Sequence, residues 1–212
     1  MAGKTKRKAR SDGDETREAI FSAAMEEFCA KGFAAASVRT ICEKAGANAA
    51  LANRYFGSKE ELYAKVAKKL FGELGSPLAK LPDKVRDDAT WREAVEEWID
   101  DMLYMTLPTK RLQRLCAGIF RHEVAAPTRF HSKFKQDFGF PVYNALKKIL
   151  MVKIKDEDEL AMWTASIWSQ VSVFALADRK WRDVFRPRGT GTREWAAKIR
   201  GHICSRLFAC YK

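Results

Sequence analysis

The chain has 212 residues, of which 47% are hydrophobic and 31% charged, and its formal net charge is +12. This composition excludes a disordered or fibrous protein and fits one large domain or a small domain plus a larger one, with a sizeable core. The basic balance favours a polyanionic partner, nucleic acid first, although residues 1–60 carry only 3 of the 12 net charges.

The cysteines and the apolar segments indicate in which cellular compartment the protein is found. Its five cysteines are odd in number and scattered through apolar helical patterns, which favours buried free thiols in a reducing cytoplasm. The basic first ten residues are followed by no apolar segment, so we expect no signal peptide. Residues 160–177 are uncharged but include five Ser, Thr or Gln residues, so a buried helix is expected there rather than a membrane span.

The N-terminal elements begin with residues 1–13, which are polar and basic and for which we expect a disordered arm. Such an arm either remains a solvated tail or follows the phosphates of a nucleic acid. A helix is predicted over residues 15–31, with an apolar stripe on one side and acidic residues at its start. Gly32 is expected to end it.

The stretch 37–56 predicts two short helices joined by a glycine turn. Ser37 can cap the first helix, whose apolar residues recur at i, i+3, i+4 and i+7 before Gly46 ends it. The second helix begins at another capping residue, Asn48. This is the spacing of a helix-turn-helix, whose second helix enters the major groove of DNA. Two ordinary helices of a bundle have the same spacing, so the pattern leaves both readings open.

The rest of the chain reads as further helices. Ser58 and Glu61 have the spacing of a capping box that opens a fourth helix. Residues 75–82 read as a linker, and Thr90 with Glu93 suggests a second capping box. Later helices are predicted over residues 109–125, 141–155, 156–181 and 192–211.

Motifs around the helix-turn-helix resemble the TetR family of transcriptional regulators over about residues 14–72. The matching marks are Gly32-Phe33, Ser37-Val38-Arg39, Ile41, Ala45-Gly46, Tyr55-Phe56 and Ser58-Lys59-Glu60-Glu61-Leu62. In the second helix, Leu51, Ala52 and Asn53 replace the Thr-Leu-Tyr of many members, a difference that concerns base preference rather than fold.

The resemblance implies an all-α fold of about nine helices in two domains. A three-helix helix-turn-helix DNA-binding domain would occupy residues 14–74, and a helical effector-binding and dimerisation domain residues 83–212. The implied function is that of a sequence-specific transcriptional regulator, most often a homodimeric repressor released from a palindromic operator in double-stranded DNA by a small-molecule effector. The alternative is a ligand-independent, DNA-bound adaptor that presents its C-terminal domain to a protein partner. An apolar internal cavity favours the former and a filled core the latter.

The resemblance also implies which residues meet DNA. Contacts to phosphates are implied for Ser37, Arg39, Tyr55 and Lys59, and contacts to bases for Ala49, Ala50, Asn53 and Arg54. Asparagine pairs with adenine and arginine with guanine, while small alanines let the backbone approach and can touch a thymine methyl group. Each is alternatively a plain surface residue, and Tyr55 alternatively belongs to the core.

In the second domain, aromatic and methionine side chains are the candidates for the walls of an effector pocket. They are Trp98, Met102, Met105, Phe120, Phe134, Phe138, Trp163 and Trp168. Each can equally be ordinary core. The resemblance implies that the helices over residues 156–181 and 192–211 form a four-helix bundle with a second copy, with the stripe Trp195, Ile199, Ile203 and Leu207 of the last helix as the candidate dimer interface. Alternatively, both helices fill the core of the monomer. Residues 105–155 hold eleven basic side chains against two acidic ones, which indicates an anionic effector or, as we prefer, a solvated basic face.

An enzyme is not expected. The three histidines lack metal-ligand spacing, and neither a nucleophile motif nor a phosphate-binding loop occurs. We therefore expect no metal and no cofactor.

Overall fold

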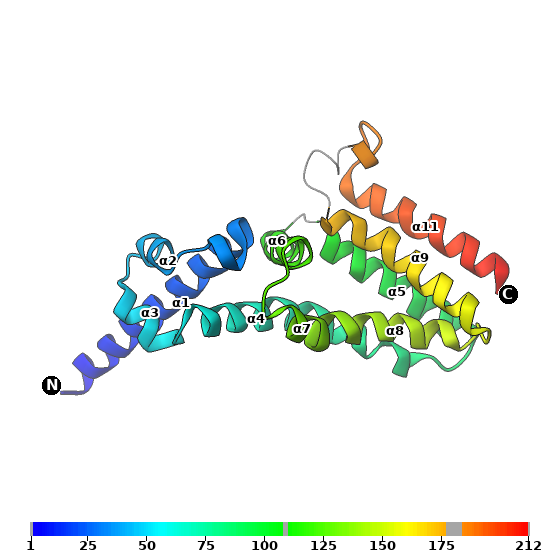
Figure 1. The fold of residues 1–212 in the computed structure, drawn as a ribbon. Helices are drawn as coiled ribbons and strands as arrows, with labels where there is room; N and C mark the ends of the chain where they lie inside the picture. The colour runs from blue at the N-terminus through cyan, green and yellow to red at the C-terminus, as the bar shows by residue number, and fades with distance from the viewer. Residues whose placement is uncertain (1, 108–109, 177–183, 212) are drawn as a thin grey trace.

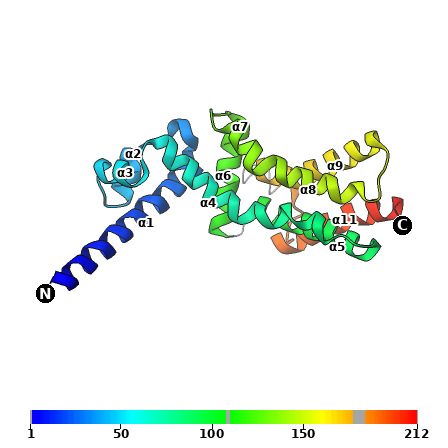
Figure 2. The ribbon, with the colours of Figure 1, turned by 90° about the horizontal axis from the view of Figure 1, so that it is seen from below.

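The computed structural model describes residues 2–107, 110–176 and 184–211, and it contains no strand in these residues. The molecule is elongated: α1, α2 and α3 lie at one end, a bundle of α5, α8, α9 and α11 lies at the other, and α4 and α6 lie between them (Figure 1; Figure 2). The N-terminal helices are α1 (Ala2–Ala35), α2 (Val38–Lys44), α3 (Ala49–Phe56) and α4 (Lys59–Ala79). The all-α prediction is confirmed.

The second part follows a short 3-10 turn, η1 (Leu81–Lys84). Its longer helices are α5 (Asp88–Thr106), α6 (Arg111–Ala125), α8 (Phe140–Met151), α9 (Glu157–Leu176) and α11 (Thr192–Cys210). A short α7 (His131–Phe134) and a π-helical turn η2 (Lys135–Gly139) lead into α8. Position 109 and positions 177–181, predicted as helix ends, lie outside the described residues.

Helix α1 begins earlier than its apolar stripe predicts. The structure continues it back to Ala2, through residues for which we predicted a disordered arm. This stretch lacks proline and is rich in Ala, Lys and Arg, residues with high helix propensity. At the other end Gly32 has a φ of 71°, a conformation that glycine adopts without steric cost, and it breaks the regular helix where we predicted.

The helix-turn-helix forms as the sequence predicts. The Asn48 side chain accepts a hydrogen bond of 2.9 Å from the backbone N–H of Leu51 and so caps α3. Gly46 has a φ of 61° in the turn between α2 and α3. Ser58 and Glu61 form a reciprocal capping box at the start of α4. These local contacts orient α3 relative to α2 and α4.

A buried carboxylate holds α1 against α2. The side chain of Glu27 is fully buried and pairs with Lys31 at 2.7 Å and with Lys44, from α2, at 2.6 Å. Burial raises the pKa of Glu27, but the hydrogen bonds from the two lysines outweigh burial and leave the pKa below its ordinary value. The ionised carboxylate therefore stabilises the fold.

The two ion pairs of Glu27 predict that the free energy of unfolding falls in acid. Because the folded-state pKa of Glu27 lies below 4.5, its stabilisation is complete above that pH and is lost as pH falls through the folded-state pKa. In urea unfolding between about pH 5 and about pH 3, the wild type should lose stability more steeply than Glu27→Gln. The exposed Glu18→Gln variant is the control and should follow the wild type. Parallel curves for wild type and Glu27→Gln would contradict the assignment.

Two boundary predictions are wrong. Helix α4 runs to Ala79, through part of the predicted linker, and contains Pro77 in its last turn at the loss of one intrahelical hydrogen bond. The capping box of α5 uses Asp87 and Thr90 rather than Thr90 and Glu93. Asp87 accepts from the backbone N–H of Thr90 at 2.8 Å, so the helix starts three residues earlier than we predicted.

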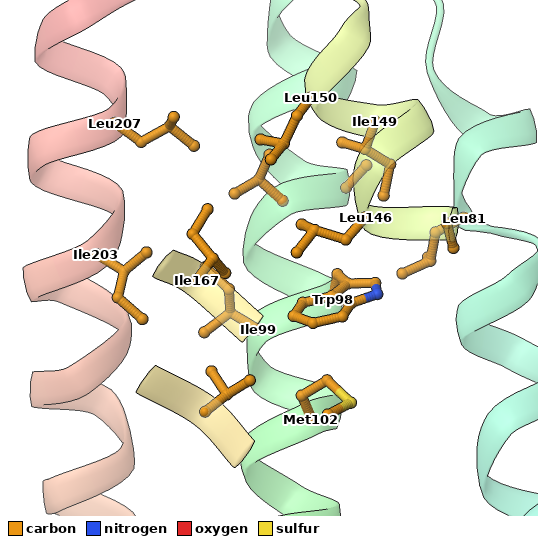
Figure 3. Close-up of a cluster of buried hydrophobic side chains, with 14 of the residues drawn as sticks. Leu81, Trp98, Ile99, Met102, Leu146, Ile149, Leu150, Ile167, Ile203 and Leu207 are labelled. Carbon is orange, nitrogen blue, oxygen red and sulfur yellow. The ribbon is translucent and has the colours of Figure 1, made fainter. Parts of the chain in front are cut away.

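The core of the second part lies between α5, α8, α9 and α11 (Figure 3). Trp98 on α5 is fully buried, and its indole N–H donates to the carbonyl of Val142 on α8 at 3.1 Å. Trp91 does the same with Ile149 at 2.8 Å. These indole hydrogen bonds fix α8 across α5.

The apolar stripe of α11 points into this core. Ile199, Ile203 and Leu207 are buried within the subunit, on the side of α11 that faces α5, and Trp195 is half-buried beside them. Figure 3 shows Ile203 and Leu207 directed toward Ile167 and Ile99. The structure therefore corrects the dimer prediction for this stripe: a regular stripe on one helix marks its inward face, whether the partner belongs to the same subunit or another.

Helix α6 packs closely on α1 and joins the two parts. A Cβ on Gly118 would lie 2.3 Å from Cys29 Sγ and 2.8 Å from the carbonyl oxygen of Cys29, so only glycine permits this approach. Arg111, at the start of α6, pairs with Glu26 on α1 at 2.7 Å. Leu115, like its neighbours on the same face of α6, belongs to the core of the helix-turn-helix part.

Candidate DNA-binding surface and internal cavity

Helix α3 presents the predicted base-reading residues on one exposed face. Ala49, Ala50, Asn53 and Arg54 are all exposed, at relative positions i, i+1, i+4 and i+5. Ala52, on the opposite side, is buried and with Phe56 anchors α3 to the core. The helix is therefore fixed in place while its outer face remains open to a ligand, at the end of the molecule away from the bundle (Figure 1).

Two of the predicted phosphate contacts lie where α2 begins. Ser37 is the N-cap residue of α2, but its side chain makes no capping hydrogen bond, contrary to our expectation. Arg39 is 88% exposed and its guanidinium pairs with Glu43 at 2.9 Å, an ion pair within one helix. Such an exposed pair contributes little to stability, so a DNA phosphate can replace Glu43 at small cost.

The other two lie around the start of α4. Tyr55 is half-buried, and the Arg54 guanidinium lies 5.7 Å from the centroid of its ring. The ammonium group of Lys59 donates to the carbonyl of Ala34 at 3.3 Å and lies 4.7 Å from the ring centroid of Phe33. Lys59 thus connects the beginning of α4 to the end of α1, and two of its three N–H donors remain for another acceptor.

The structure places Arg17, which is not among the predicted DNA contacts, near this surface. Its guanidinium lies 5.8 Å from the ring centroid of Phe56, the last residue of α3, and its side chain is exposed. Residue 17 lies four helical turns before Gly32, far from the helix-turn-helix in sequence. Only the packing of α1 on α3 brings its side chain to this surface.

An apolar cavity lies in the second part, where α5, α6, α8 and α9 meet α4. The space open to the centre of a water molecule is about 70 Å³. Six of the eight predicted pocket residues line it: Met102, Met105, Phe120, Phe134, Phe138 and Trp168. The other two lie elsewhere, Trp98 in the core and Trp163 with its ring centroid 6.4 Å from that of Tyr211.

Seven further residues line the cavity beyond those predicted. They are Phe71, Thr106, Cys116, Ala117, Gly139, Val142 and Ser172. Ser172 follows Trp168 by four residues on α9, a spacing that places both on one helix face and is visible in the sequence. Phe71 comes from α4, and only the packing of α4 against η2 brings it here.

The cavity shares its walls with the helix-turn-helix part. The ring of Phe71 on α4 lies 4.7 Å from that of Phe134, centroid to centroid. Cys116 lines the cavity, belongs to the core of the helix-turn-helix part, and donates through its thiol to the carbonyl of Leu70 at 3.6 Å. A molecule entering the cavity would therefore press on α4 and α6 directly.

The basic side chains of residues 105–155 do not line this cavity. Most are exposed, which fits a solvated basic face. In the described part of the chain, no three His, Cys, Asp or Glu side chains gather closely enough to hold a metal ion. Within the same residues, no helix has both the length and the apolar character needed to cross a membrane.

Buried polar contacts connect the two parts beside the cavity. The carboxylate of Glu123 on α6 is 1% exposed and accepts from the hydroxyl of Tyr63 on α4 at 2.6 Å and from the hydroxyl of Thr128 at 2.8 Å. Burial, with the hydrogen bond to Glu123, strongly raises the pKa of Tyr63, so its phenol stays protonated. Tyr63 is therefore a permanent donor from α4 to α6.

Comparison with known proteins gives two kinds of match. Residues 20–66 match the family described as bacterial regulatory proteins, tetR family. An HTH-type transcriptional repressor of Streptomyces coelicolor is 35% identical over 95 residues, which cover 45% of this chain and 44% of that protein. The chain thus matches less than half the length of this curated relative.

Solved structures share the fold over most of the chain. HlyIIR, a hemolysin II transcriptional regulator, is 20% identical, and the match covers 94% of this chain and 98% of that chain with a TM-score of 0.61. FadR from Bacillus subtilis, solved in complex with stearoyl-CoA, is 14% identical over 89% of this chain and 97% of that chain, with a TM-score of 0.64. At such identities the likeness is one of fold.

Proposed function

Since the chain belongs to the TetR family of transcriptional regulators, we propose that it is a homodimeric repressor that leaves its operator when a small molecule enters the apolar cavity. The observation that carries the DNA-binding part is the exposed face of α3, with Asn53 and Arg54 projecting from a helix anchored by Ala52 and Phe56. Asparagine and arginine are the side chains that pair bidentately with adenine and guanine in the major groove.

Contacts to the DNA backbone would orient this helix. We propose that Ser37, Arg39, Tyr55 and Lys59 meet phosphates, since they surround the base-reading face: Ser37 and Arg39 at the beginning of α2, Tyr55 near the end of α3 and Lys59 at the beginning of α4. Phosphate contacts set register and affinity, whereas base contacts set sequence choice. The beginning of α1, where five of the first ten residues of the chain are basic, would add salt-dependent affinity.

A two-fold dimer would supply the second half-site. The outer face of α9 is uncharged and exposed from Ala161 to Leu176: it consists of Ala161, Met162, Ala165, Ser166, Ser169, Val173 and Leu176. The outer face of α11 carries small residues four apart, namely Ala197, Gly201, Ser205 and Ala209. Small side chains on rows four residues apart let helices approach and interlock. We propose that these two faces meet the same faces of a second copy, in place of the buried stripe of α11.

A charge on this face is expected to separate the dimer. Ala165→Glu would bury two like charges across the two-fold axis, at a cost of about 3 kcal/mol or more, so the dimer should dissociate at least about 100-fold more readily. Analytical ultracentrifugation measures this, and Asn144→Glu, an exposed change on α8, is the control. A variant Ala165→Glu that dimerises as tightly as the wild type would place the interface elsewhere.

Release by a small molecule is supported by the position of the cavity. Phe71 on α4 and Cys116 on α6 both line it, and both helices pack on the helix-turn-helix core. A ligand that favours one arrangement of α4 and α6 shifts the spacing of the two recognition helices and so the DNA affinity. A similar fold holds stearoyl-CoA in FadR, which also supports an effector site. The alternative, a ligand-independent adaptor bound to DNA, is expected to have a filled core, so the cavity does not favour it.

Footprinting of genomic DNA from the source organism tests the proposal. The purified wild-type chain should protect two symmetric half-sites about one helical turn, or a multiple of it, apart. Ligands that raise the melting temperature of the protein should then be added to the bound DNA, and at least one should abolish the footprint. A footprint that persists with every stabilising ligand would contradict the release mechanism, and protection without symmetry would contradict the dimer.

A further inference from the structure

The cavity contains a polar group that the protein leaves without a partner. Ser172 on α9 is 6% exposed and lines the cavity, and its hydroxyl oxygen has no hydrogen-bond partner in the described residues. Other hydroxyls of α9 are satisfied within the helix: Thr164 donates to the carbonyl of Leu160 at 2.6 Å, and Ser169 to that of Ala165 at 2.7 Å. Ser172 therefore differs from its neighbours.

A buried hydroxyl without a partner is unfavourable, because it has lost its hydrogen bonds to water. The other polar side chain of the wall does not compensate for it, since the Thr106 hydroxyl donates to the carbonyl of Met102 at 2.8 Å. The Cys116 thiol donates to the carbonyl of Leu70, the remaining lining residues are Trp168, glycine or apolar, and none of the lining residues is charged. A hydrogen-bonding group on a bound molecule is what would satisfy Ser172.

The rest of the wall defines the body of that molecule. The rings of Phe120 and Phe134 lie 6.1 Å apart, those of Phe134 and Phe138 5.7 Å apart, and Trp168 lies on the opposite helix. Aromatic walls favour a ligand with an apolar, ring-containing body. The open space of about 70 Å³ is several times what one water molecule requires but smaller than the roughly 150 Å³ of a cavity that holds benzene, so a ring compound enters as the flexible Met102 and Met105 side chains of the wall move aside. A charged group here would lose its hydration without gaining a counter-ion.

We infer that the effector is an uncharged, mainly apolar ring compound with one hydrogen-bonding oxygen, and that Ser172 is the residue that binds this oxygen. The inference deepens the proposed release mechanism and rests on it for its biological meaning. Ser172 is then a specificity residue, because its hydroxyl forms a hydrogen bond with a ligand that has the oxygen and stays unsatisfied when an oxygen-free analogue binds.

Isothermal titration calorimetry on the full-length dimer tests this with three probes of nearly the same shape: naphthalene, 1-naphthol and 1-naphthoate. The wild type should bind 1-naphthol about tenfold more tightly than naphthalene, and at least about tenfold more tightly than the 1-naphthoate anion. Ser172→Ala should bind 1-naphthol and naphthalene equally. Ser169→Ala, which removes a satisfied hydroxyl from the same helix, should keep the wild-type preference.

A second measurement separates a binding role from a structural one. Because the Ser172 hydroxyl has no partner in the free protein, ligand-free Ser172→Ala should melt at the same temperature as the wild type or higher. A melting temperature several degrees lower would show that the hydroxyl supports the fold, and would overturn the inference. So would a wild type that binds none of the probes, prefers 1-naphthoate, or does not distinguish 1-naphthol from naphthalene. These titrations contain no DNA, so they test ligand binding independently of operator binding. Either proposal can be contradicted while the other holds.

Discussion

Replacing Asn53 by alanine is expected to weaken specific DNA binding by at least about 30-fold. A bidentate contact to a base is worth about 1–3 kcal/mol, and a two-fold dimer makes it twice, so the total loss is about 2–6 kcal/mol. The fold should not change, because the Asn53 side chain is exposed on α3 while Ala52 and Phe56 hold the helix. Fluorescence anisotropy with operator and random DNA at one salt concentration measures the effect.

The matched control is Asn144→Ala, an exposed asparagine on α8, which should leave DNA affinity unchanged. The ratio of specific to random binding decides the role of Asn53. If Asn53→Ala weakened both kinds of binding equally, Asn53 would be a backbone contact rather than a base contact. If neither changed, α3 would not enter the groove with this face.

The second large effect is expected at the contact between α4 and α6. Tyr63→Phe removes one hydroxyl without changing the shape of the core, and it deprives the buried carboxylate of Glu123 of its 2.6 Å hydrogen bond. Hydrogen bonds to a charged group contribute about 1.5–3 kcal/mol, and a buried charge that loses a donor is strongly unfavourable. The free energy of unfolding should therefore fall by about 2 kcal/mol.

Urea unfolding measures this loss, with Tyr104→Phe as the control. Tyr104 is a tyrosine on α5 that is 45% exposed, so its change should stay within about 0.5 kcal/mol. A Tyr63→Phe protein as stable as the control would show that Glu123 is satisfied by Thr128 alone. Because Tyr63 lies on α4 and Glu123 on α6, the same variant should also respond more weakly to an effector in DNA-release assays.

The helix-turn-helix was predictable because its signals are local. Gly46, Asn48 and the Ser58–Glu61 capping box act within a few residues of themselves, and each adopts the geometry its type favours. The family resemblance of these motifs is confirmed by the match over residues 20–66. The exposed face of α3 follows from the same local order, since its inward residues are fixed by the apolar pattern.

The cavity was only partly predictable, because it depends on contacts between distant segments. Aromatic residues of α6, η2 and α9 are visible in the sequence, but Phe71 reaches the cavity only through the packing of α4. Ser172 looked like one of several polar residues in an apolar helix. Its missing hydrogen bond, which separates it from Thr164 and Ser169, depends on side-chain orientation that no sequence pattern contains.

The direction of an apolar stripe was not predictable at all. Ile203 and Leu207 recur at helical spacing, but the pattern is the same for a helix that packs on its own subunit and for one that packs on a second copy. The structure places them against α5 and leaves the row with Gly201 and Ser205 outside. Small residues give a weak sequence signal, so the sequence indicated the last two helices as dimer helices but not the face by which they would meet a second copy.

Selection of bound fragments from a random DNA library with the purified full-length chain shows whether α3 reads DNA sequence. We expect an enriched inverted repeat, with half-sites about one helical turn or a multiple of it apart. Asn53→Ala should lose the preference at one symmetric pair of positions and Arg54→Ala at another. No enrichment, or the same enriched sequence from all three proteins, would contradict the claim that α3 reads DNA.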